Sequence, residues 1–552
     1  MEMFTDVPTP EEMACCDAEA MALGFPEEAL MENAACAAIA CLRRRIPSCA
    51  SGLRGMRVLL LAGGGNNGGD AFCMARHFYD AGALPAVVLS RPPAPGGAAA
   101  RWLDVLRRMP VPIVMAGEWL GGTAQVLDGM RPDLIVDGLM GTGLRGQLRE
   151  TECRIIGKAL EWKRLGAHVF AIDIPSGMTG MSGRPSPIAL AADVTAAFHA
   201  PKPGLLMPDA AAFTGILEVC SIGMPRAAAA RARASFRTWL LPGQERSAAS
   251  GSWLVCRGAD SPGSGDDLQV YAACAAHAPS HKGEAGKVLV IGGCRAYAGA
   301  PCLSALGAFR AGAGLVTVAG PGPVPAALRA ACPAAISAVL PDRSDGKGWL
   351  ASDADVLIPA MLRADAVVLG PGLGRGEEEE QLVELLVSAP ERPPMVIDAD
   401  ALFAVGSRPE TLRHLQAGDI LTPHPGEAAA LLGSTSREVQ EDRTGALLRL
   451  TGLCPSACVL KGEGTLIGRR DEASVISPWR VPQLAVAGSG DVLSGIAAAL
   501  LAQHRDAVEA AAVAVWTHAL AGMRIAPSFP MRGNTPQDIA DAVPHALAAA
   551  CA

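Results

Sequence analysis

Apolar runs alternate with helix-like stretches along the chain, and this alternation occurs in two separate parts of the sequence. In the first part, residues 56–62 form an almost continuous apolar run that ends in a glycine-rich loop, and a helix is predicted over about 70–81. Runs of this kind are typical of strands that are buried on both faces of a sheet. Further buried strands are predicted at 86–89, 134–137, 169–174 and 216–222. The order of the elements predicts a mostly parallel sheet covered by helices.

The alternation starts again at residues 287–293, an apolar run that ends in two glycines. Later strand candidates lie at 315–319, 366–369, 395–398, 419–421 and 458–461. Between the two parts, from about 226 to 280, the pattern is lost, and Ala- and Arg-rich residues give way to a loop rich in Ser, Gly and Asp. We therefore predict two three-layer α/β domains, at 1–225 and 278–552, joined by a linker at 226–277.

The composition narrows the class of protein. A chain of 552 residues is too long for a single core, and half of its residues are hydrophobic. The net charge of −8, with scattered lysines and arginines, gives no basic patch for nucleic acid. The N-terminus lacks the features of a signal peptide, and we find no uninterrupted apolar run that predicts a membrane span. We expect a soluble cytoplasmic protein.

Cysteine usage agrees with that expectation. The 16 cysteines lie mostly singly inside apolar runs, and no C-x-x-C pair occurs. This usage predicts reduced, buried thiols rather than zinc ligands or a disulfide framework.

Three glycine-rich acidic loops follow predicted strands of the first part, at 63–70, 137–144 and 173–177. The first, Gly-Gly-Gly-Asn-Asn-Gly-Gly-Asp, opens a helix but does not have the G-x-G-x-x-G spacing. Because ligands of open α/β sheets bind at the carboxyl ends of the strands, the loops are expected to converge on one ligand. Their Asn, Asp and Ser oxygens also suit a hard monovalent cation. The alternative is that each glycine only ends a strand.

These loops, together with residues 30–35 and 202–204, resemble the NAD(P)H-hydrate epimerase domain. The resemblance covers about residues 10–225 and implies a Rossmann-like epimerase fold. It implies that Asp173 is the acid/base residue at the reacting ring, and that a potassium ion is held by Asn67, Asp137 and Ser176. It also implies that the hydrated dinucleotide contacts Asn66, Asn67, Gly68, Gly69, Asp70, Gly141, Thr142, Gly143, Leu144, Arg145, Gly146, Gln147 and Asp173. One departure is Ala71, where the family usually carries glycine.

The second part contains Gly488-Ser489-Gly490-Asp491 at the predicted start of an apolar helix. Free N–H groups there, with the positive end of the helix dipole, make an anion site. A neighbouring aspartate can take a proton from a hydroxyl while the anion site holds a phosphoryl group, which is the chemistry of a small-molecule kinase. The alternative is an ordinary N-terminal helix turn.

Four more loops follow predicted strands, at 370–374, 398–402, 422–427 and 461–465. A lysine and glycine-rich backbone can hold nucleotide phosphates, while acidic residues hold magnesium or orient a substrate. The pattern G-x-x-x-x-G-K-[ST] is absent, so this is not a P-loop enzyme. Taken singly, His424 could be a turn histidine and Lys461 a solvated strand end.

These loops, with residues 281–287, 297–300 and 310–316, resemble the ribokinase-like NAD(P)H-hydrate dehydratase over about 278–550. By that resemblance, the adenine nucleotide contacts Lys461, Gly462, Glu463, Gly464, Thr465 and Gly490. The hydrated cofactor contacts Ala300, Gly374, His424 and Asp491, with Asp491 as the general base. The acidic run at 398–400 is expected to help place Mg²⁺.

The two resemblances predict a bifunctional nicotinamide-nucleotide repair enzyme. Its first domain would interconvert R- and S-NAD(P)HX, and its second would use ADP or ATP to dehydrate the S form with release of phosphate. The fused arrangement favours ADP, and a homo-oligomer is expected. One rival is a vitamin or sugar kinase with a non-catalytic first domain. The other is a non-catalytic scaffold, which the retained Asp173 and Asp491 and the lack of basic patches disfavour.

Overall fold

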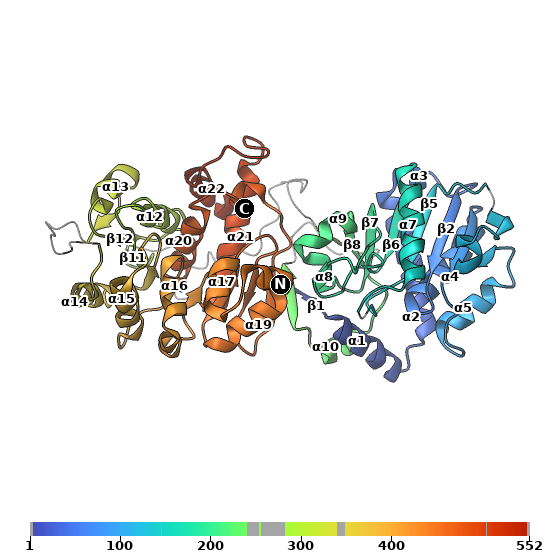
Figure 1. The fold of residues 1–552 in the computed structure, drawn as a ribbon, viewed down its shortest axis with the longest axis horizontal. Helices are drawn as coiled ribbons and strands as arrows, with labels where there is room; N and C mark the ends of the chain where they lie inside the picture. The colour runs from blue at the N-terminus through green and yellow to red at the C-terminus, as the bar shows by residue number, and fades with distance from the viewer. Residues whose placement is uncertain are drawn as a thin grey trace. The chain divides into compact units, whose positions relative to one another are not determined.

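The computed structural model describes residues 4–127, 129–144, 146–239, 253–255, 282–338, 340, 348–503 and 505–548. These residues form two compact units (Figure 1). The first contains the described residues up to 255, and the second contains those from 282 onward. Both units are mixed α/β with largely parallel sheets, which confirms the predicted fold class.

The sheet of the first unit has eight strands in the order β10-β8-β7-β6-β5-β2-β3-β4. Neighbouring strands are parallel, except that β10 is antiparallel to β8. The strands are β2 (Arg57–Ala62), β3 (Leu84–Leu89), β4 (Ile113–Met115), β5 (Leu134–Gly138), β6 (His168–Ile172), β7 (Val194–Phe198), β8 (Ile216–Cys220) and β10 (Trp253–Val255). From β2 the chain builds outward through β3 and β4, and then in the opposite direction from β5 to β8. Ligands of open α/β sheets bind at such a reversal, which lies here between β2 and β5.

The residues of β2 point alternately to two helical layers, which explains its continuous apolar run. Val58 and Leu60 belong to a buried cluster with α2 (Glu27–Arg45) and α4 (Asn66–Asp80). Leu59 and Leu61 belong to a second cluster that includes residues of α7 (Glu150–Arg164). Full burial of one such side chain stabilises the fold by about 2 kcal/mol, so both layers hold the strand in place.

The first unit also contains seven shorter α-helices among its described residues. They are α1 (Pro10–Ala22), α3 (Pro47–Ala50), α5 (Ala98–Leu106), α6 (Ala116–Leu120), α8 (Pro203–Leu206), α9 (Ala211–Thr214) and α10 (Arg226–Ala232). Helix α4 begins at Asn66, four residues before the predicted helix, because the second half of the Gly-Asn loop forms its first turn.

Part of the predicted linker is folded into the first unit. Helix α10 packs against α1, and β9 (Phe236–Trp239) pairs antiparallel with β1 (Phe4–Val7). The Ser235 N–H donates to Glu12 Oε1 at 3.1 Å, which ties this segment to α1. Residues 226–239, and β10 at 253–255, therefore belong to the first unit, although the linker was predicted over 226–277. The loop predicted at 261–267 lies outside the described residues.

The second unit has a sheet in the order β19-β18-β17-β16-β15-β14-β11-β12-β13. The strands from β17 to β13 in this order are parallel, and β17, β18 and β19 are antiparallel. They are β11 (Lys287–Ile291), β12 (Leu315–Ala319), β13 (Ile336–Ser337), β14 (Ala366–Leu369), β15 (Met395–Ile397), β16 (Ile420–Leu421), β17 (Ala457–Leu460), β18 (Leu466–Gly468) and β19 (Ser474–Ile476).

The α-helices of this unit flank the strands in sequence. They are α12 (Ala300–Arg310), α13 (Val324–Ala331), α14 (Ala354–Met361), α15 (Glu377–Ser388), α16 (Asp400–Ser407), α17 (Pro425–Leu432), α18 (Ser436–Glu441), α19 (Arg443–Leu453), α20 (Ser489–Ala502), α21 (Ala507–Ile525) and α22 (Pro536–Ala548). Helices α12 and α20 touch through their backbones at two glycines. A Cβ on Gly495 would lie 2.0 Å from the Ser304 carbonyl oxygen, and one on Gly307 would lie 2.4 Å from that of Val492. This close packing fixes the start of α20 against the start of α12.

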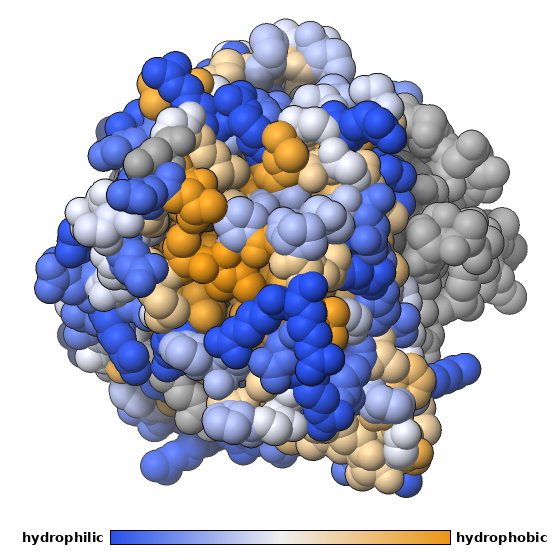
Figure 2. Space-filling view, turned by 90° about the vertical axis from the view of Figure 1, so that its right-hand side faces the viewer, coloured by the Kyte–Doolittle hydropathy of each residue, from blue (hydrophilic) through white to orange (hydrophobic). Residues whose placement is uncertain are grey.

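The structure also bears on two further expectations, the lack of a membrane span and the burial of the cysteines. No helix in the described part of the chain is long and apolar enough to cross a membrane. Most described cysteines are buried free thiols, but Cys15 and Cys36 are exposed, and Cys36 lies 3.5 Å from His77 Nε2, beside Glu32. Arg76 donates to Glu32 and contacts the same His77 nitrogen. The Arg76 guanidinium therefore already occupies the Glu32 and His77 atoms that a metal ion would need. Figure 2 shows apolar side chains gathered within a hydrophilic surround on one face of the molecule.

Candidate active sites

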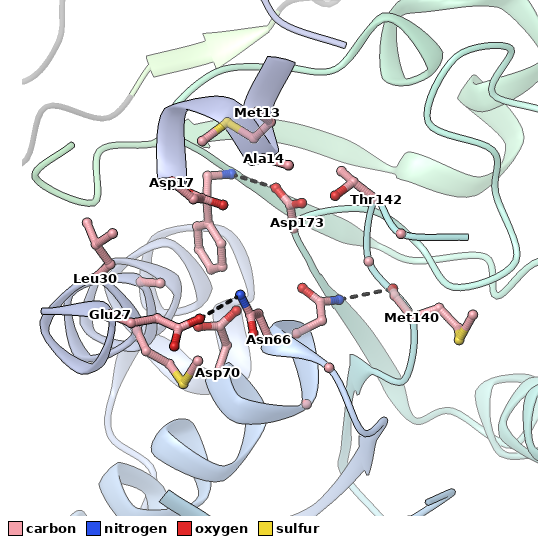
Figure 3. A pocket seen from close by; sticks show the side chains of 18 of the residues that line it. Met13, Ala14, Asp17, Glu27, Leu30, Asn66, Asp70, Met140, Thr142 and Asp173 are labelled. Atoms are coloured by element: carbon pink, nitrogen blue, oxygen red, sulfur yellow. Dashed lines mark hydrogen bonds between the residues drawn. The ribbon is translucent and has the colours of Figure 1, made fainter. Parts of the chain in front are cut away.

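A cleft of about 360 Å³ lies in the first unit, where the loops after β2, β3, β5 and β6 meet α1 and α2. Several of the predicted contact residues line it, namely Asn66, Asn67, Gly68, Asp70, Gly141, Thr142, Gly143, Leu144 and Asp173. Gly146 and Gln147 are not among the lining residues, and Arg145 lies outside the described residues. The structure therefore brings the three glycine-rich loops together, as expected from their positions at the ends of neighbouring strands (Figure 3).

The loop before α4 and the first turn of α4 require glycine because the two backbone segments lie in close contact. A Cβ on Gly68 would lie 1.9 Å from the Gly63 carbonyl oxygen, and one on Gly63 would lie 2.1 Å from that of Leu139. Gly69 faces the interior, where a Cβ would lie 2.5 Å from Met31 Sδ. Gly69 thus packs against α2 and does not line the cleft. The first turn of α4 offers its free N–H groups at the cleft, which suits the phosphates of a ligand.

Asn67, Asp137 and Ser176 are joined through one hydrogen-bond network behind the cleft. Ser176 Oγ donates to Asp137 Oδ1 at 2.5 Å, and Ser176 N–H donates to Oδ2 at 2.7 Å. The Asn67 amide donates to the carbonyl oxygens of Met140 and Ile172, each at 3.0 Å. Burial raises the pKa of Asp137 to about 6, although the Ser176 hydrogen bonds oppose this shift. Asp137 makes no ion pair with a described residue, so the negative charge of its buried carboxylate is not neutralised by a side-chain cation there.

Asp173 is held at the cleft by an ion pair that the sequence analysis did not identify. Lys202 Nζ contacts Asp173 Oδ1, and it also donates to the Phe198 carbonyl oxygen at 3.0 Å. The Lys202 side chain is only 1% exposed, so this cation has little access to water. Asp173 has a φ of 62°, an unusual conformation for a residue other than glycine. Residues 202–204 carried the resemblance to the epimerase family, but no role followed for Lys202.

Three further carboxylates point toward the cleft from different elements (Figure 3). They are Asp17 on α1, Glu27 on α2 and Asp70 on α4. Burial raises the pKa of Asp17 to about 6, with a smaller effect from Asp173 and an opposing one from Lys202. Burial also raises the pKa of Asp70 well above its ordinary value. Asp17 was not predicted, because nothing in the sequence of α1 distinguishes it from a surface carboxylate.

Helix α20 begins in the second unit as predicted, directly after Gly488. Gly488 has a φ of +89°, and the helix starts at Ser489. Asp491 therefore lies in the first turn, where N–H groups have no partner within the helix. Burial, together with the nearby carboxylates Asp398, Glu427 and Asp400, raises the pKa of Asp491 to about 8, and Lys461 opposes this shift.

Lys461 links the other predicted residues of this site. Its Nζ lies 2.6 Å from Asp398 Oδ1 and 3.7 Å from Glu427 Oε2. A Cβ added to Gly490 would lie 3.4 Å from the same nitrogen. Burial alone would lower the pKa of Lys461, but the neighbouring carboxylates, Asp398 first, raise it. Lys461 is thus a partly buried cation, with its side chain 17% exposed, at the start of α20, and it is paired with carboxylates instead of being a solvated strand end.

His424 caps α17 and contacts the same cluster. Its Nδ1 accepts the Gly426 N–H at 2.9 Å, so Nε2 carries the proton and faces Glu427 Oε1 at 3.2 Å. Burial and Lys461 lower the pKa of His424, whereas burial raises that of Glu427 to about 7. His424 is therefore both a helix cap and a member of the predicted site.

The glycine-rich loop after β14 lies between α12 and α16. Gly374 N–H donates to Asp400 Oδ2 at 3.0 Å. A Cβ on Gly372 would lie 3.1 Å from that of Ala300, so this loop packs against the start of α12. The predicted contact residues Ala300 and Gly374 therefore lie near each other, because Ala300 packs against Gly372 of the loop that contains Gly374.

Two buried residues that the sequence analysis missed support these loops. Arg443 donates to the carbonyl oxygens of Leu460, Lys461 and Gly464 at 3.1, 3.2 and 3.3 Å. His518 on α21 lies 3.1 Å from Ser489 Oγ, and burial lowers its pKa to about 4. Both act from elements distant in sequence, so no local motif marks them.

Replacement of Gly488 by alanine should weaken both stability and dehydration. The positive φ costs a residue with a Cβ about 1–2 kcal/mol, and that Cβ would also lie 2.5 Å from Leu303 Cδ1. We expect a lower thermal midpoint for the second unit and a lower turnover number for dehydration. Gly452→Ala is the matched control, because its Cβ meets no atom within 4 Å. Equal behaviour of the two variants would contradict the role of the Gly488 turn.

Comparison with known proteins finds a matching family for each half of the chain. A family model described as NAD(P)H-hydrate dehydratase matches residues 288–545, and one described as YjeF-related protein N-terminus matches 27–204. The bifunctional NAD(P)H-hydrate repair enzyme of Moorella thermoacetica is 33% identical over 530 residues, which cover 95% of this chain and 93% of that protein. The chain belongs to the bifunctional NAD(P)H-hydrate repair enzyme family.

Other members of the repair enzyme family match over most of their length. The Escherichia coli enzyme is 33% identical over 493 residues, which cover 87% of this chain and 83% of that protein. A solved ADP/ATP-dependent NAD(P)H-hydrate dehydratase from Bacillus subtilis, co-crystallised with ATP and Mg²⁺, is 26% identical. It covers 49% of this chain and 91% of its own, with a TM-score of 0.41. Membership of the repair enzyme family confirms the predicted recognition and favours the repair function over both rivals.

Proposed function

We propose that this chain restores hydrated NADH and NADPH in two steps, one in each unit. The first unit would interconvert the R and S epimers at C6 of the hydrated nicotinamide ring. The second would phosphorylate the C6 hydroxyl of the S epimer and eliminate phosphate. The observation that carries this proposal is the position of Asp491 beside the partly buried Lys461 at the start of α20, within a family of such enzymes.

In the second unit, Asp491 would accept the proton of the C6 hydroxyl while that oxygen attacks the terminal phosphorus of the nucleotide. The nucleotide leaves with the electron pair of the broken P–O bond. Lys461 and the free N–H groups at the start of α20 would stabilise the charge on the transferred group. The C6–O bond then breaks, phosphate leaves with its electron pair, and loss of a proton from C5 restores the ring double bond.

In the first unit, Asp173 would exchange protons with the oxygen on C6 of the substrate. Epimer exchange needs a group that protonates the C6 hydroxyl as the C6–O bond breaks and water leaves, and a group that accepts a proton as water adds to the opposite face of C6. Asp17, whose pKa of about 6 leaves part of it protonated near neutral pH, would complement Asp173. The glycine-rich loops would hold the rest of the dinucleotide.

Two metal ions fit the residues that are present. The oxygens of Asp137, Ser176, Met140 and Ile172 gather around one network, and Asn67 adds a side-chain amide, which suits K⁺. The uncompensated Asp137 carboxylate would gain a counter-charge. Asp398 and Asp400 offer the carboxylate oxygens that suit Mg²⁺, which neutralises nucleotide phosphates when bound. ADP or ATP would be the phosphoryl donor, and the fused arrangement favours ADP.

We also propose that the protein works in the cytoplasm as a homo-oligomer. Met115 exposes an apolar side chain at the end of the edge strand β4, where a second copy can pack, and Leu84 at the start of β3 and Val105 on α5 are further exposed apolar residues of this unit. Light scattering on the purified chain tests this assembly, and a monomer at micromolar concentration would exclude it.

The decisive experiment follows the reduced-nicotinamide absorbance of mixed-epimer NADHX with the purified chain, Mg²⁺, K⁺ and either ADP or ATP. We expect complete recovery of NADH, with one phosphate released per molecule, and the faster donor identifies the nucleotide. Recovery that stops at the S fraction would mean that the first unit is inactive. A stable phosphorylated product, or no recovery with either donor, would contradict the repair function.

A further inference from the structure

The loop after β3 carries an arginine at the position where doubly wound folds recognise the ribose of a dinucleotide. Strand β3 is the parallel neighbour of β2, and β2 leads into the Gly-Asn loop. In such folds the residue that follows this second strand bonds the adenosine ribose. It is an acidic residue when the ligand is NAD, and an arginine nearby accommodates the 2′-phosphate of NADP. Here β3 ends at Leu89, and Ser90-Arg91-Pro92-Pro93 follows without an acidic residue.

Arg91 lines the cleft and lies against the loop that opens α4. A Cβ added to Gly64 would lie 3.0 Å from Arg91 Cγ and 3.2 Å from its Nε. Gly64 therefore gives the arginine stem room to lie across the loop. The guanidinium is exposed, and no hydrogen bond or ion pair joins it to another described residue.

The charge distribution of the cleft distinguishes Arg91 from the other basic residue there. Arg91 and Lys202 are the basic residues among the described lining, and Lys202 is committed to Asp173. The lining also carries four carboxylates, Asp17, Glu27, Asp70 and Asp173, none of them in the loop after β3. A polyanionic dinucleotide needs a cation away from these carboxylates, and Arg91 supplies five donors in a fork that matches phosphate.

The separation of Arg91 from Asp173 agrees with a dinucleotide lying along the sheet edge. Arg91 follows β3 and Asp173 follows β6, with β2 and β5 between them. Three strand spacings amount to about 14 Å across the sheet. The reacting ring at Asp173 and the adenosine ribose at Arg91 would thus occupy opposite ends of one cleft.

We propose that Arg91 binds the 2′-phosphate of hydrated NADPH, so that the first unit prefers NADPHX to NADHX. This inference rests on the epimerase function proposed above. It assigns the substrate preference of that site to one side chain, because the 2′-phosphate is the group that distinguishes the two substrates.

The test follows the conversion of purified R epimers into S epimers by chromatography. ADP and ATP are left out so that dehydration cannot take place. For the wild-type chain, kcat/KM should be about tenfold to a hundredfold higher for NADPHX, the range expected for a charge-assisted bond. Arg91→Ala should remove this preference through a higher KM for NADPHX, leave NADHX unchanged, and reduce the salt dependence. Arg91→Lys should retain part of the preference. Arg108→Ala, an exposed arginine outside the cleft lining, is the matched control.

Two results would overturn the assignment. An equal loss for both substrates in Arg91→Ala would mean that Arg91 contacts the shared pyrophosphate, and no change for either would mean that it contacts neither. Absence of wild-type exchange with both substrates would instead refute the epimerase function. In that case, binding of NADP⁺ and NAD⁺ to wild type and Arg91→Ala, followed by thermal shift, still tests the 2′-phosphate contact. A similar NADP⁺ shift in both proteins would overturn it.

Discussion

Asp491→Asn should abolish the recovery of NAD(P)H from the S epimer while epimer exchange continues at the wild-type rate. Asparagine keeps the shape of the side chain but cannot accept the hydroxyl proton. General-base catalysis typically contributes about 10²- to 10⁴-fold, so we expect dehydration to fall by at least that factor. The measurement is the initial rate of absorbance recovery with ADP or ATP, compared with R-to-S exchange in the same preparation.

The stability of this variant separates a catalytic loss from misfolding. The native pKa of Asp491 is about 8, above its ordinary value of 3.8. Between these values the unfolded chain loses a proton that the native protein keeps, so stability falls as the pH rises. Asp491→Asn removes this effect and should unfold at a higher temperature than wild type at pH 8. For wild type, kcat/KM should rise toward pH 8 as the base ionises.

Asp355→Asn on the exposed face of α14 is the matched control and should change neither activity nor stability. If Asp491→Asn retained dehydration, Asp491 could not be the base. If it lost epimer exchange as well, the two sites could not be independent.

Asp173→Asn should have the complementary effect, with loss of enzymatic epimer exchange and normal dehydration of the S epimer. Asparagine tolerates the positive φ of residue 173, so the backbone need not change. The loss should again be about 10²- to 10⁴-fold, down to the slow spontaneous exchange. With mixed-epimer substrate, NADH should be recovered rapidly from the S fraction. Recovery from the R fraction should then proceed only at the slow rate of spontaneous epimer exchange.

Lys202 makes the stability of this second variant informative too. Without the Asp173 carboxylate, a cation that is 1% exposed loses its acidic partner, and the first unit should unfold at a lower temperature. Lys202→Met in the Asp173→Asn background should recover part of that stability without restoring exchange. Unchanged exchange in Asp173→Asn would remove this residue from the reaction.

The sequence was sufficient for the strands that are continuously apolar and for the loops that follow them. Residues 315–319 and 366–369 were predicted with the bounds that the structure shows for β12 and β14. The start of α20 was equally clear, because Gly488 and an apolar helix are local signals. The convergence of the loops followed from parallel topology, which brings the carboxyl ends of strands to one edge.

The remaining elements depend on partners that are distant in the chain. Strand β7 has the composition Val-Thr-Ala-Ala-Phe, which is weakly apolar and becomes a strand between β6 and β8. Residues 226–239 look like a linker until α1 and β1 supply their contacts. Asp17 and His518 acquire their roles only from the residues packed around them, so the sequence gives no spacing from which to find them.

The three carbonyl groups held by Arg443 determine which way the loop at 461–465 presents its amides. In a trans peptide the N–H points opposite to the preceding C=O. The carbonyls of Lys461 and Gly464 face Arg443, so the N–H groups of Gly462 and Thr465 point away from it. The Lys461 N–H is already bound to the Pro423 carbonyl oxygen at 2.8 Å. Two oriented dipoles are therefore in place before the proposed binding of a nucleotide to this loop, and the cost of aligning them would fall on folding instead of on each catalytic cycle.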